Sequence, residues 1–435
     1  MTAALRSQLP FMIRPTYPRE LRAWLLFSFA LGAVEGGVAG VLVKNLFTGH
    51  VDDGLLNTMV ALVAGAPALA MITSFFWANL NQGRDKIRFL LFAQVACMLC
   101  LLLIAFAPID TLGLFIMAGG AIAARCFWTA VTTVRATVWR ANFPKPQMGK
   151  LAGSMVRIMT LVMGLTGIVL GIALGYYPHA FRWIYPLLAG LGLVGAFVYR
   201  GIRVRRQKIL LRHERELVEK EPRLPGPGVL WSVLHNDRNF RRYMKLMFVF
   251  GTGNIMLIPV LIIILSEHFN MPQLHQILII SSIPLLLMAT SIPVWSRFLD
   301  RGHVIHYRAR QSWSFPMTFA VYLAAVVLHQ PLLFWLGAIM HGIGMGGGVL
   351  GWNLGHLDFA APERAAQYMG THVTLTGVRG LFAPLLGVWI YQGLEQAVPG
   401  NGIYVMVLPL GLATLAAFGF VRMSRDLRAQ QSAVQ

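Results

Sequence analysis

The segment from Gly201 to Lys245 begins GIRVRRQKILLRHERELVEKEPRLPGPG and ends LHNDRNFRRYMK. It is the one long polar stretch of the chain, and apolar runs dominate residues 1–200 and 246–435 on either side of it. This segment could be a linker, a binding domain or a divider between two halves. The choice depends on the structure of the two parts that it separates.

The composition is that of an integral membrane protein. Of the 435 residues, 56% are hydrophobic and only 12% are charged, and the mean hydropathy is +0.62. Soluble domains carry about 25% charged residues. The three cysteines, Cys97, Cys100 and Cys126, lie within apolar runs and indicate neither a disulfide framework nor a metal site. We expect no metal and no cofactor.

A membrane-spanning helix needs about 20 apolar residues. We therefore predict an all-α integral membrane protein with twelve transmembrane helices. The predicted spans are residues 23–44, 55–77, 89–107, 111–138, 152–175, 183–200, 245–266, 276–296, 312–329, 332–354, 367–391 and 403–422. They form two bundles of six, 23–200 and 245–422, with a terminal segment 1–22, a central loop 201–244 and a tail 423–435.

The basic residues give an orientation. With the N-terminus in the cytoplasm, most of the 37 lysines and arginines fall in cytoplasmic segments, and only Lys44 and Arg182 fall in outer loops. This positive-inside pattern predicts a multi-pass protein of the cytoplasmic (inner) membrane with both termini cytoplasmic. The net charge of +20 then reflects topology and attraction to membrane lipids, so no nucleic-acid partner is expected.

The two bundles resemble one another in sequence. PALAMITSFFWANL from Pro67 matches PLLLMATSIPVWSRFL from Pro284, about 217 residues later. LGAVEGG around Glu35 corresponds to FGTGNIM around Asn254, and ANFPKPQMGKLAG corresponds to LDFAAPERAAQYMG. A repeat of this length in the same order predicts two parallel six-helix repeats.

On this repeat and topology the chain resembles the major facilitator superfamily over nearly its whole length. The loop Asn81-Gln82-Gly83-Arg84-Asp85-Lys86 keeps part of the family signature, and Asp300-Arg301-Gly302 stands at the equivalent place. The resemblance implies a monomeric secondary transporter that works by alternating access. It also implies gating roles for the signature residues, which are Gly83, Arg84, Asp300 and Arg301. The proline common in drug antiporters is absent from the fifth span.

Glu35 is the acidic residue placed well inside a predicted span, about twelve residues from its start. A carboxyl group at mid-membrane can exchange a proton near neutral pH, which favours a proton-coupling role. It could equally serve as the structural partner of a buried arginine.

Arg125 and Arg379 also fall near the middle of their spans. A guanidinium group binds carboxylate or phosphate bidentately, so a cavity with more arginines than acids favours an anionic substrate. The alternatives are an internal Glu35–Arg125 pair together with arginines hydrogen-bonded to helix carbonyls and, for Arg379 within GVRGLFAP, a gate hinge.

Five further residues are weaker candidates. Arg157 lies near the cytoplasmic end of its span and fits a gate or an interfacial cation. His341 and His372 fit proton carriers, substrate contacts or packing residues. Asn254 could bind substrate or bridge helices, and Trp128 could stack on a substrate or fill the core.

We therefore expect a secondary transporter of a small anionic organic solute, coupled to protons, and not an enzyme. An exporter of amphipathic drug-like or siderophore-like compounds and a non-transporting scaffold on the same fold are the alternatives. The glycines of Gly342–Gly355 indicate close helix packing, because no strand precedes them and no Walker lysine occurs. The central segment is then a tether that contains a surface helix between the two repeats.

Overall fold

The computed structural model describes residues 13, 16–143, 145–220, 227–300, 302–360 and 364–432. Within these ranges the chain forms helices and no strand, which confirms the predicted fold class. Among the described residues, eleven helical segments are long and apolar enough to cross a membrane, and the first of them, Tyr17–Phe47, includes both α2 (Tyr17–Ala33) and α3 (Gly36–Phe47). The ninth predicted span, 312–329, contains α16 (Ser314–Val327), and the short helix α15 (Val304–Gln311) directly precedes it.

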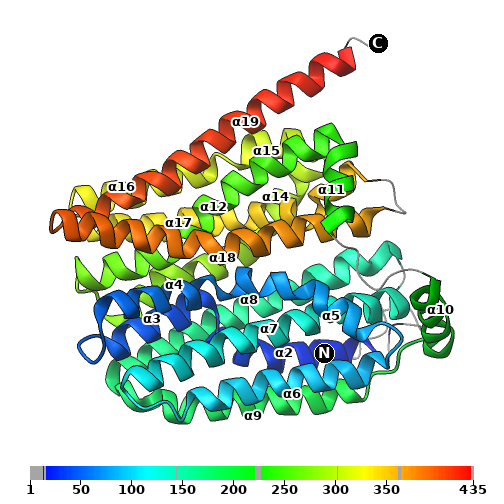
Figure 1. The fold of residues 1–435 in the computed structure, drawn as a ribbon, viewed down its shortest axis with the longest axis horizontal. Coiled ribbons are helices and arrows are strands. Elements are labelled where there is room, and N and C mark those ends of the chain that lie inside the picture. Colours follow the sequence, from blue (N-terminus) through cyan, green and yellow to red (C-terminus); the bar gives the residue numbers. More distant parts are fainter. Residues whose placement is uncertain are drawn as a thin grey trace. The chain divides into compact units, whose positions relative to one another are not determined.

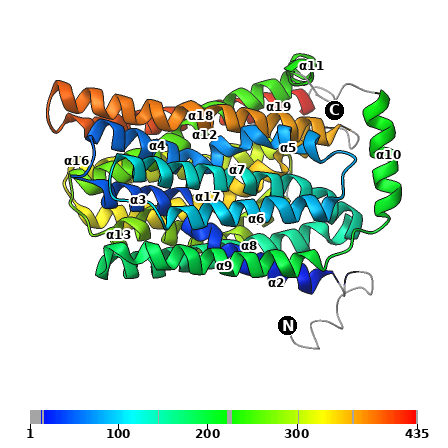
Figure 2. The same cartoon turned by 60° about the horizontal axis from the view of Figure 1, so that its bottom comes forward.

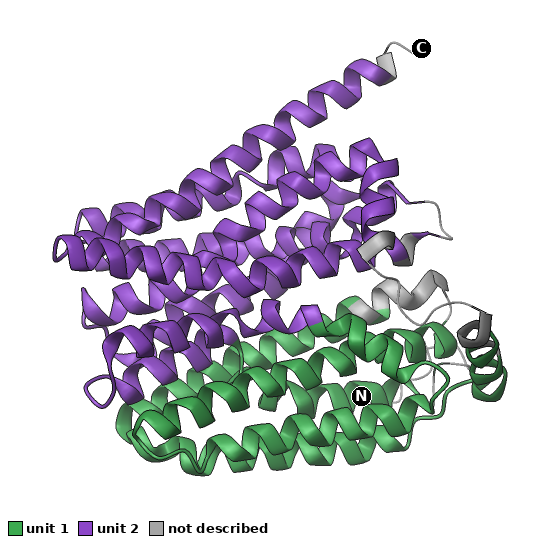
Figure 3. Ribbon diagram, in the orientation of Figure 1, with its two compact units in different colours: residues 1–35, 73–225 green, residues 36–72, 226–435 purple. Residues whose placement is uncertain are grey.

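The helices form two compact units, which Figure 3 shows in separate colours. Unit 1 comprises Met1–Glu35 with Thr73–Pro225, and unit 2 comprises Gly36–Ile72 with Gly226–Gln435. Residues 36–72 belong to the first repeat of the sequence but pack within unit 2. The divisions fall inside the first and second predicted spans, where the helices are interrupted.

Unit 1 is a bundle of long helices, labelled in Figure 1. Its helices are α2 (Tyr17–Ala33), α5 (Ser74–Asn81), α6 (Lys86–Ile104), α7 (Thr111–Asn142), α8 (Lys145–Tyr176), α9 (Phe181–Arg200) and α10 (Gln207–Lys220). α2 packs against α8 and α9, and α6 packs against α7 and α9. α10 runs across the ends of α6 and α9 (Figure 2), and it lies within the predicted surface helix of the central segment.

Unit 2 contains the second repeat, the later part of the first predicted span and the earlier part of the second. Its helices are α3 (Gly36–Phe47), α4 (Asp53–Leu69), α11 (Pro227–Asn236), α12 (Arg238–Glu267), α13 (Gln273–Ile277), α14 (Ile283–Leu299), α15, α16, α17 (Pro331–Leu354), α18 (Ala365–Ala397) and α19 (Val407–Ser432). α12 packs against α18 and α19, and α14 packs against α17. α4 packs against α18, so helices from both sequence repeats meet inside this unit.

Aspartate side chains begin four of the long helices. Asp52, Asp85, Asp110 and Asp237 each accept a hydrogen bond of 2.8–2.9 Å from the backbone N–H three residues later. These bonds satisfy donors that the first helical turn leaves free. Four of the 17 acidic residues are therefore used at helix starts.

The glycine-rich stretch Gly342–Gly355 is helical, as predicted, and belongs to α17 and the short turn after it. At Gly346 a Cβ atom would lie only 2.1 Å from Oγ of Ser291 on α14. The missing side chain thus lets α14 and α17 approach closely, which is the packing role expected from the sequence.

Candidate functional site

The first predicted span is interrupted at Glu35. α2 ends at Ala33 and α3 begins at Gly36, so Val34 and Glu35 lie between two helices. This corrects the expectation of one unbroken helix through Glu35. Glycine is a poor helix former, and a Cβ atom at Gly36 would lie 2.3 Å from the Ala64 carbonyl oxygen, so the chain bends where it contacts α4.

The interruption frees two carbonyl groups, and two side chains of unit 1 satisfy them. Nε of Arg125 donates to the Val34 carbonyl at 2.7 Å, and the Tyr185 hydroxyl donates to the Ala33 carbonyl at 2.8 Å. Arg125 also interacts electrostatically with Glu35, whose side chain is half-buried. Unsatisfied backbone groups are costly in a membrane. Arg125 therefore closes the broken helix and lies beside the candidate proton carrier.

A second charged cluster lies in unit 1 and escaped the sequence reasoning. The carboxylate of fully buried Glu20 accepts from Trp139 Nε1 at 2.9 Å and from the Tyr199 hydroxyl at 3.0 Å. The Arg135 guanidinium lies 3.4 Å from the ring centroid of Trp24 and 4.2 Å from that of Trp139. The sequence did contain a signal for this cluster, because Arg135 is a charged residue inside the predicted span 111–138.

Trp128 and Arg157 occupy contrasting environments. The Trp128 ring is 6% exposed and packs against Trp24 and Phe27, with ring centroids 5.1 and 5.5 Å away. Arg157 is exposed on α8. No contact of Trp128 or Arg157 with Glu35 or Arg125 is found in the described part of the chain.

The signature loop before α6 binds α10. Glu214 of α10 accepts from the backbone N–H of Gly83 at 2.8 Å and from Nζ of Lys86 at 2.6 Å. Nε of Arg215 donates to the Gly83 carbonyl at 3.3 Å. Gly83 has φ +72°, a conformation that glycine adopts without strain, whereas Arg84 is exposed. The loop is thus attached to the central segment within unit 1.

In unit 2, Arg379 is buried between α18 and α12. Its Nη1 donates to the Met247 carbonyl, and its Nη2 donates to Thr376 Oγ1 at 2.9 Å. His372 lies two turns earlier on α18, is fully buried, and packs against the Trp352 ring at 5.2 Å. Both ring nitrogens of His372 and Nε of Arg379 have no hydrogen-bond partner in the described part of the chain.

Arg308 is a further buried arginine of unit 2, and it was predicted to lie in a cytoplasmic loop. It is 1% exposed on α15. Nη1 donates to Gln311 Oε1 at 2.7 Å and Nη2 donates to the Gly348 carbonyl at 3.2 Å, while Nε has no partner among the described residues. A separate helix, α15, therefore occupies part of the predicted loop before the ninth span and buries Arg308.

These side chains form an electropositive cluster. His372 lies within electrostatic range of Arg308, Arg379 and His356, and the two arginines lie within range of each other. Neither guanidinium forms an ion pair with a carboxylate in the part of the chain that is described. Asp358, which follows His356 by two residues, is 38% exposed and accepts from the Val304 backbone N–H at 2.6 Å. The cluster has cationic donors that an anion could satisfy.

The remaining candidates of unit 2 lie apart from this cluster or outside the description. His341 is 3% exposed and surrounded by the rings of Phe315, Phe319 and Tyr322, which is a packing environment. Asn254 is half-buried on α12, and its Oδ1 has no partner among the described residues. Asp300 caps the end of α14 and is exposed, and Arg301 lies outside the described residues.

A buried ion pair joins α3 to α12. Nζ of Lys44 lies 2.5 Å from Oε1 of Glu267 and donates to Asn57 Oδ1 at 2.8 Å. Asn57 Nδ2 and the Tyr391 hydroxyl also donate to the Glu267 carboxylate, at 3.1 and 2.6 Å. Lys44 is 1% exposed, which corrects its expected place in an outer loop. We call Lys44, Asn57, Glu267 and Tyr391 the α3–α12 network.

The sequence held a signal for this network. Lys44 ends the first predicted span, and Glu267 directly follows the seventh. Equivalent spans of two parallel repeats run in the same direction, so the two residues should lie at the same depth. A comparison of the two depths would therefore have predicted an ion pair between Lys44 and Glu267.

Long apolar helices and buried ionic groups between them define a multi-pass helical membrane protein. A family model of the Major Facilitator Superfamily matches residues 23–384. The chain therefore belongs to this superfamily. It is a transporter rather than an enzyme, and its family and fold are those of secondary transporters. No curated protein sequence matches the chain.

Solved transporter structures share the fold at low sequence identity. A D-xylose-proton symporter is 12% identical with a TM-score of 0.70, covering 93% of this chain and 96% of its own. The nucleoside transporter NupG is 13% identical with a TM-score of 0.68, and the match covers 94% of this chain and 99% of the NupG chain. An auto-inhibited POT family peptide transporter is 13% identical with a TM-score of 0.68, and the match covers 94% of this chain and 96% of the peptide transporter chain.

Proposed function

We propose that this secondary transporter moves a small anionic organic solute across the cytoplasmic membrane by alternating access, with coupling to protons. The observation that carries the anionic assignment is the electropositive cluster of Arg308, Arg379, His356 and His372. Burying cations without a compensating charge is unfavourable. A carboxylate or phosphate group of a substrate would supply that charge.

The unpaired donors support the same assignment. The Nε atoms of Arg308 and Arg379 and both ring nitrogens of His372 have no hydrogen-bond partner among the described residues. Most buried polar atoms in proteins are hydrogen-bonded, so each such group requires an explanation. Anion binding accounts for the Nε–H donors of Arg308 and Arg379 and for the one ring N–H of His372, because a neutral imidazole has one donor and one acceptor nitrogen.

Proton coupling is assigned to Glu35 because it lies at the break between α2 and α3, half-buried beside Arg125. Loss or gain of a proton on Glu35 changes the charge that faces Arg125, whose Nε holds the Val34 carbonyl. A local charge change at a broken helix links protonation to backbone geometry. One similar structure is, by its name, a proton symporter.

The α3–α12 network supports alternating access. Lys44 and Asn57 belong to the first sequence repeat, whereas Glu267 and Tyr391 belong to the second. Relative motion of the two repeats would have to break these bonds. In the predicted orientation, with both termini cytoplasmic, the network lies at the outer ends of its helices.

The anionic assignment is tested by melting the purified protein with matched pairs of metabolites, one anionic and one neutral, such as a carboxylate and its amide. A ligand that binds the folded state raises the melting temperature by mass action. We expect the anion of at least one pair to stabilise the wild type and its neutral analogue to have no effect.

Arg379→Gln should remove that stabilisation, because it deletes one guanidinium of the cluster. Arg310→Gln is the matched control, since Arg310 is exposed on α15 next to Arg308. Equal stabilisation by anionic and neutral partners, or retention of anion binding in Arg379→Gln, would contradict an anion site in this cluster.

A further inference from the structure

Each arginine of the electropositive cluster lies against a glycine of a neighbouring helix. At Gly251 of α12, a Cβ atom would lie 2.8 Å from Nε of Arg379 and closer still to Cζ and Nη1. At Gly351 of α17, a Cβ atom would lie 2.6 Å from Nε of Arg308, 2.7 Å from Cζ and 2.8 Å from Nη2. Any side chain at either position would therefore overlap a guanidinium group.

α12 approaches the second arginine as well. Phe250 directly precedes Gly251, and its ring centroid lies 5.9 Å from Cζ of Arg308. Two turns earlier on α12, the Tyr243 hydroxyl donates to the Gly351 carbonyl at 3.3 Å and lies within electrostatic range of both arginines. The two glycine contacts thus belong to one arrangement, in which α12 lies beside both guanidinium groups.

The glycines set the position of the donors that remain available. Nη1 and Nη2 of Arg308 and Arg379 donate to acceptors of the protein. The two Nε atoms have no partner among the described residues. Nε is also one of the atoms that a Cβ at either glycine would overlap. A methyl group there would therefore move the donors that an anion could bind.

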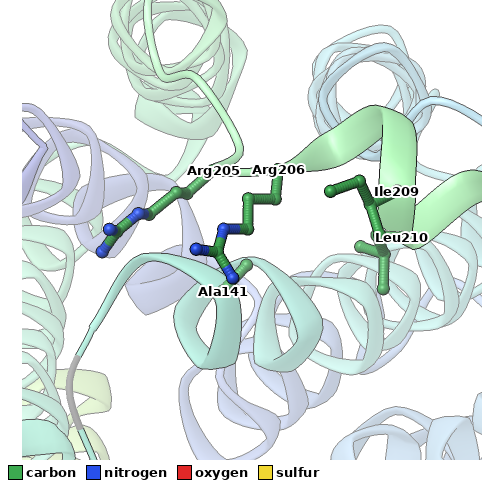
Figure 4. A pocket seen from close by; sticks show the side chains of 5 residues that line it. All are labelled: Ala141, Arg205, Arg206, Ile209 and Leu210. Atoms are coloured by element: carbon green, nitrogen blue, oxygen red, sulfur yellow. The ribbon is translucent and has the colours of Figure 1, made fainter.

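A cavity of unit 1 shows how arginines behave without such seats. Its volume is about 570 Å³, and Figure 4 shows its walls, which are Ala141, Arg205, Arg206, Ile209 and Leu210. The two arginines of this cavity are exposed, so water solvates them. Arg308 and Arg379 are only 1% and 4% exposed. Their glycine seats bring them into a place where water competes little with an anion.

The geometry points to Gly251 and Gly351 as positioning residues that determine anion selectivity, an inference that rests on the proposed function. Each glycine leaves room for one guanidinium group, and together the two groups attract a carboxylate or phosphate of the solute. The overlapping atoms are the far end of a flexible side chain. Alanine at either position therefore displaces the guanidinium group rather than the helix, and it should weaken binding more than folding.

Two other glycines serve as matched controls. Gly251 stands second in FGTGNIM, and Gly32 stands second in the equivalent LGAVEGG of the first repeat. A Cβ atom at Gly32 would lie 2.8 Å from Cβ of Thr166, and one at Gly342 of α17 would lie 2.7 Å from the Pro284 carbonyl oxygen. These atoms are part of the backbone or next to it, so alanine should lower stability at both positions without moving an arginine.

The affinity test uses the purified full chain with succinate, its neutral diamide succinamide, and inorganic phosphate as probes. Melting temperature as a function of probe concentration gives an apparent affinity. We expect Gly251→Ala and Gly351→Ala each to weaken anion binding by about tenfold or more, the contribution of one hydrogen bond to a charged group. Gly32→Ala and Gly342→Ala should bind the anion with wild-type affinity, although both melt at lower temperature. Succinamide should stabilise none of the variants.

A double-mutant cycle tests the seat without any ligand. Gly251→Ala should lower the melting temperature slightly in the wild-type background, because the displaced Arg379 loses its bond to Thr376. It should not do so in the Arg379→Gln background, because the shorter side chain leaves room for the methyl group. Additive effects of the two substitutions would overturn the contact on which the inference depends.

The outcomes separate this inference from the proposed function. If neither succinate nor phosphate stabilises the wild type, the anionic assignment fails, and the selectivity role of the glycines fails with it. If the wild type binds an anion and the Gly251→Ala and Gly351→Ala variants bind it equally well, only the role of the glycines is overturned. Equal losses of affinity in Gly32→Ala and Gly342→Ala would indicate a general packing effect and would overturn it too.

Discussion

The Nζ atom of Lys44 on α3 lies 2.5 Å from Oε1 of Glu267, the last residue of α12. The two residues are 223 positions apart and belong to different sequence repeats. The lysine is almost fully buried, and Glu267 retains 31% of its side-chain exposure. Because Asn57 and Tyr391 complete the hydrogen bonding of this carboxylate, the ion pair is part of a network that joins four helices.

Lys44→Met should destabilise the protein, because it leaves the Glu267 carboxylate without its cationic partner. Breaking a buried pair on one side costs about 3–5 kcal/mol. We expect the lower end of this range, about 3 kcal/mol, because Glu267 is partly exposed. The melting temperature of the purified protein measures the effect.

The double variant Lys44→Met/Glu267→Met is the control for this prediction. It leaves neither charge buried alone, so it should be more stable than either single variant. A double variant no more stable than the weaker single one would show that the two charges are not coupled.

Glu35→Gln should abolish accumulation driven by a pH gradient and preserve exchange of the solute across the membrane. The amide cannot change its charge, although it keeps the size and hydrogen-bonding capacity of the carboxyl group. Uptake into proteoliposomes with and without an imposed pH gradient measures both activities. Glu35→Asp should keep gradient-driven uptake, and gradient-driven uptake at the wild-type rate in Glu35→Gln would remove the proton-coupling role.

Arg125→Ala should destabilise unit 1 by about 1–3 kcal/mol, the cost of leaving a buried acceptor without a donor. The acceptor is the Val34 carbonyl at the end of α2. Tyr185→Phe is a narrower comparison, because it removes only the donor to the Ala33 carbonyl and keeps the ring. Melting temperatures that equal the wild-type value in both variants would exclude a structural role for these bonds.

The fold followed from the sequence because span length, the distribution of basic residues and the repeat around Pro67 and Pro284 are properties of the chain itself. The interruption at Glu35 did not, because a glycine-rich stretch is compatible with either a continuous or a broken membrane helix. Arg308 was misplaced because α15 begins with the polar sequence VIHYRARQ, which a search for apolar runs rejects. Burial of such a helix depends on the Gly348 carbonyl and Gln311, contacts that only the folded chain reveals.

The attachment of α10 to the signature loop leads to a further prediction. Glu214→Gln should increase hydrogen exchange of the α10 amides, because the bond from Lys86 Nζ loses its charged acceptor while the bond to the Asn81 carbonyl at 3.0 Å is unchanged. Lys86 is 1% exposed, so water has little access to its ammonium group and cannot readily take the place of the Glu214 carboxylate. Glu216→Gln is the control, since Glu216 pairs with the exposed Arg212, and its exchange should match the wild type.

His303 predicts how stability depends on pH. It lies before α15, and its Nδ1 accepts from the Ile305 backbone N–H at 3.2 Å. Burial lowers the pKa of His303 below its usual value, and this effect outweighs the opposing influence of Asp358. A histidine with a lowered pKa in the folded state takes up its proton more readily when unfolded.

Stability from His303 is therefore fully present above about pH 6.5, the usual pKa of histidine, and is lost as the pH falls through that value toward the folded-state pKa. Protonation of Nδ1 would also break the bond to Ile305, because the nitrogen could no longer accept. We expect the melting temperature of His303→Asn, which keeps a side-chain acceptor for the helix start, to fall less between pH 7.5 and pH 5 than that of the wild type. His179→Asn, at a histidine in unit 1, serves as the comparison and should follow the wild type. Parallel melting curves for wild type and His303→Asn across this range would show that His303 does not titrate with unfolding.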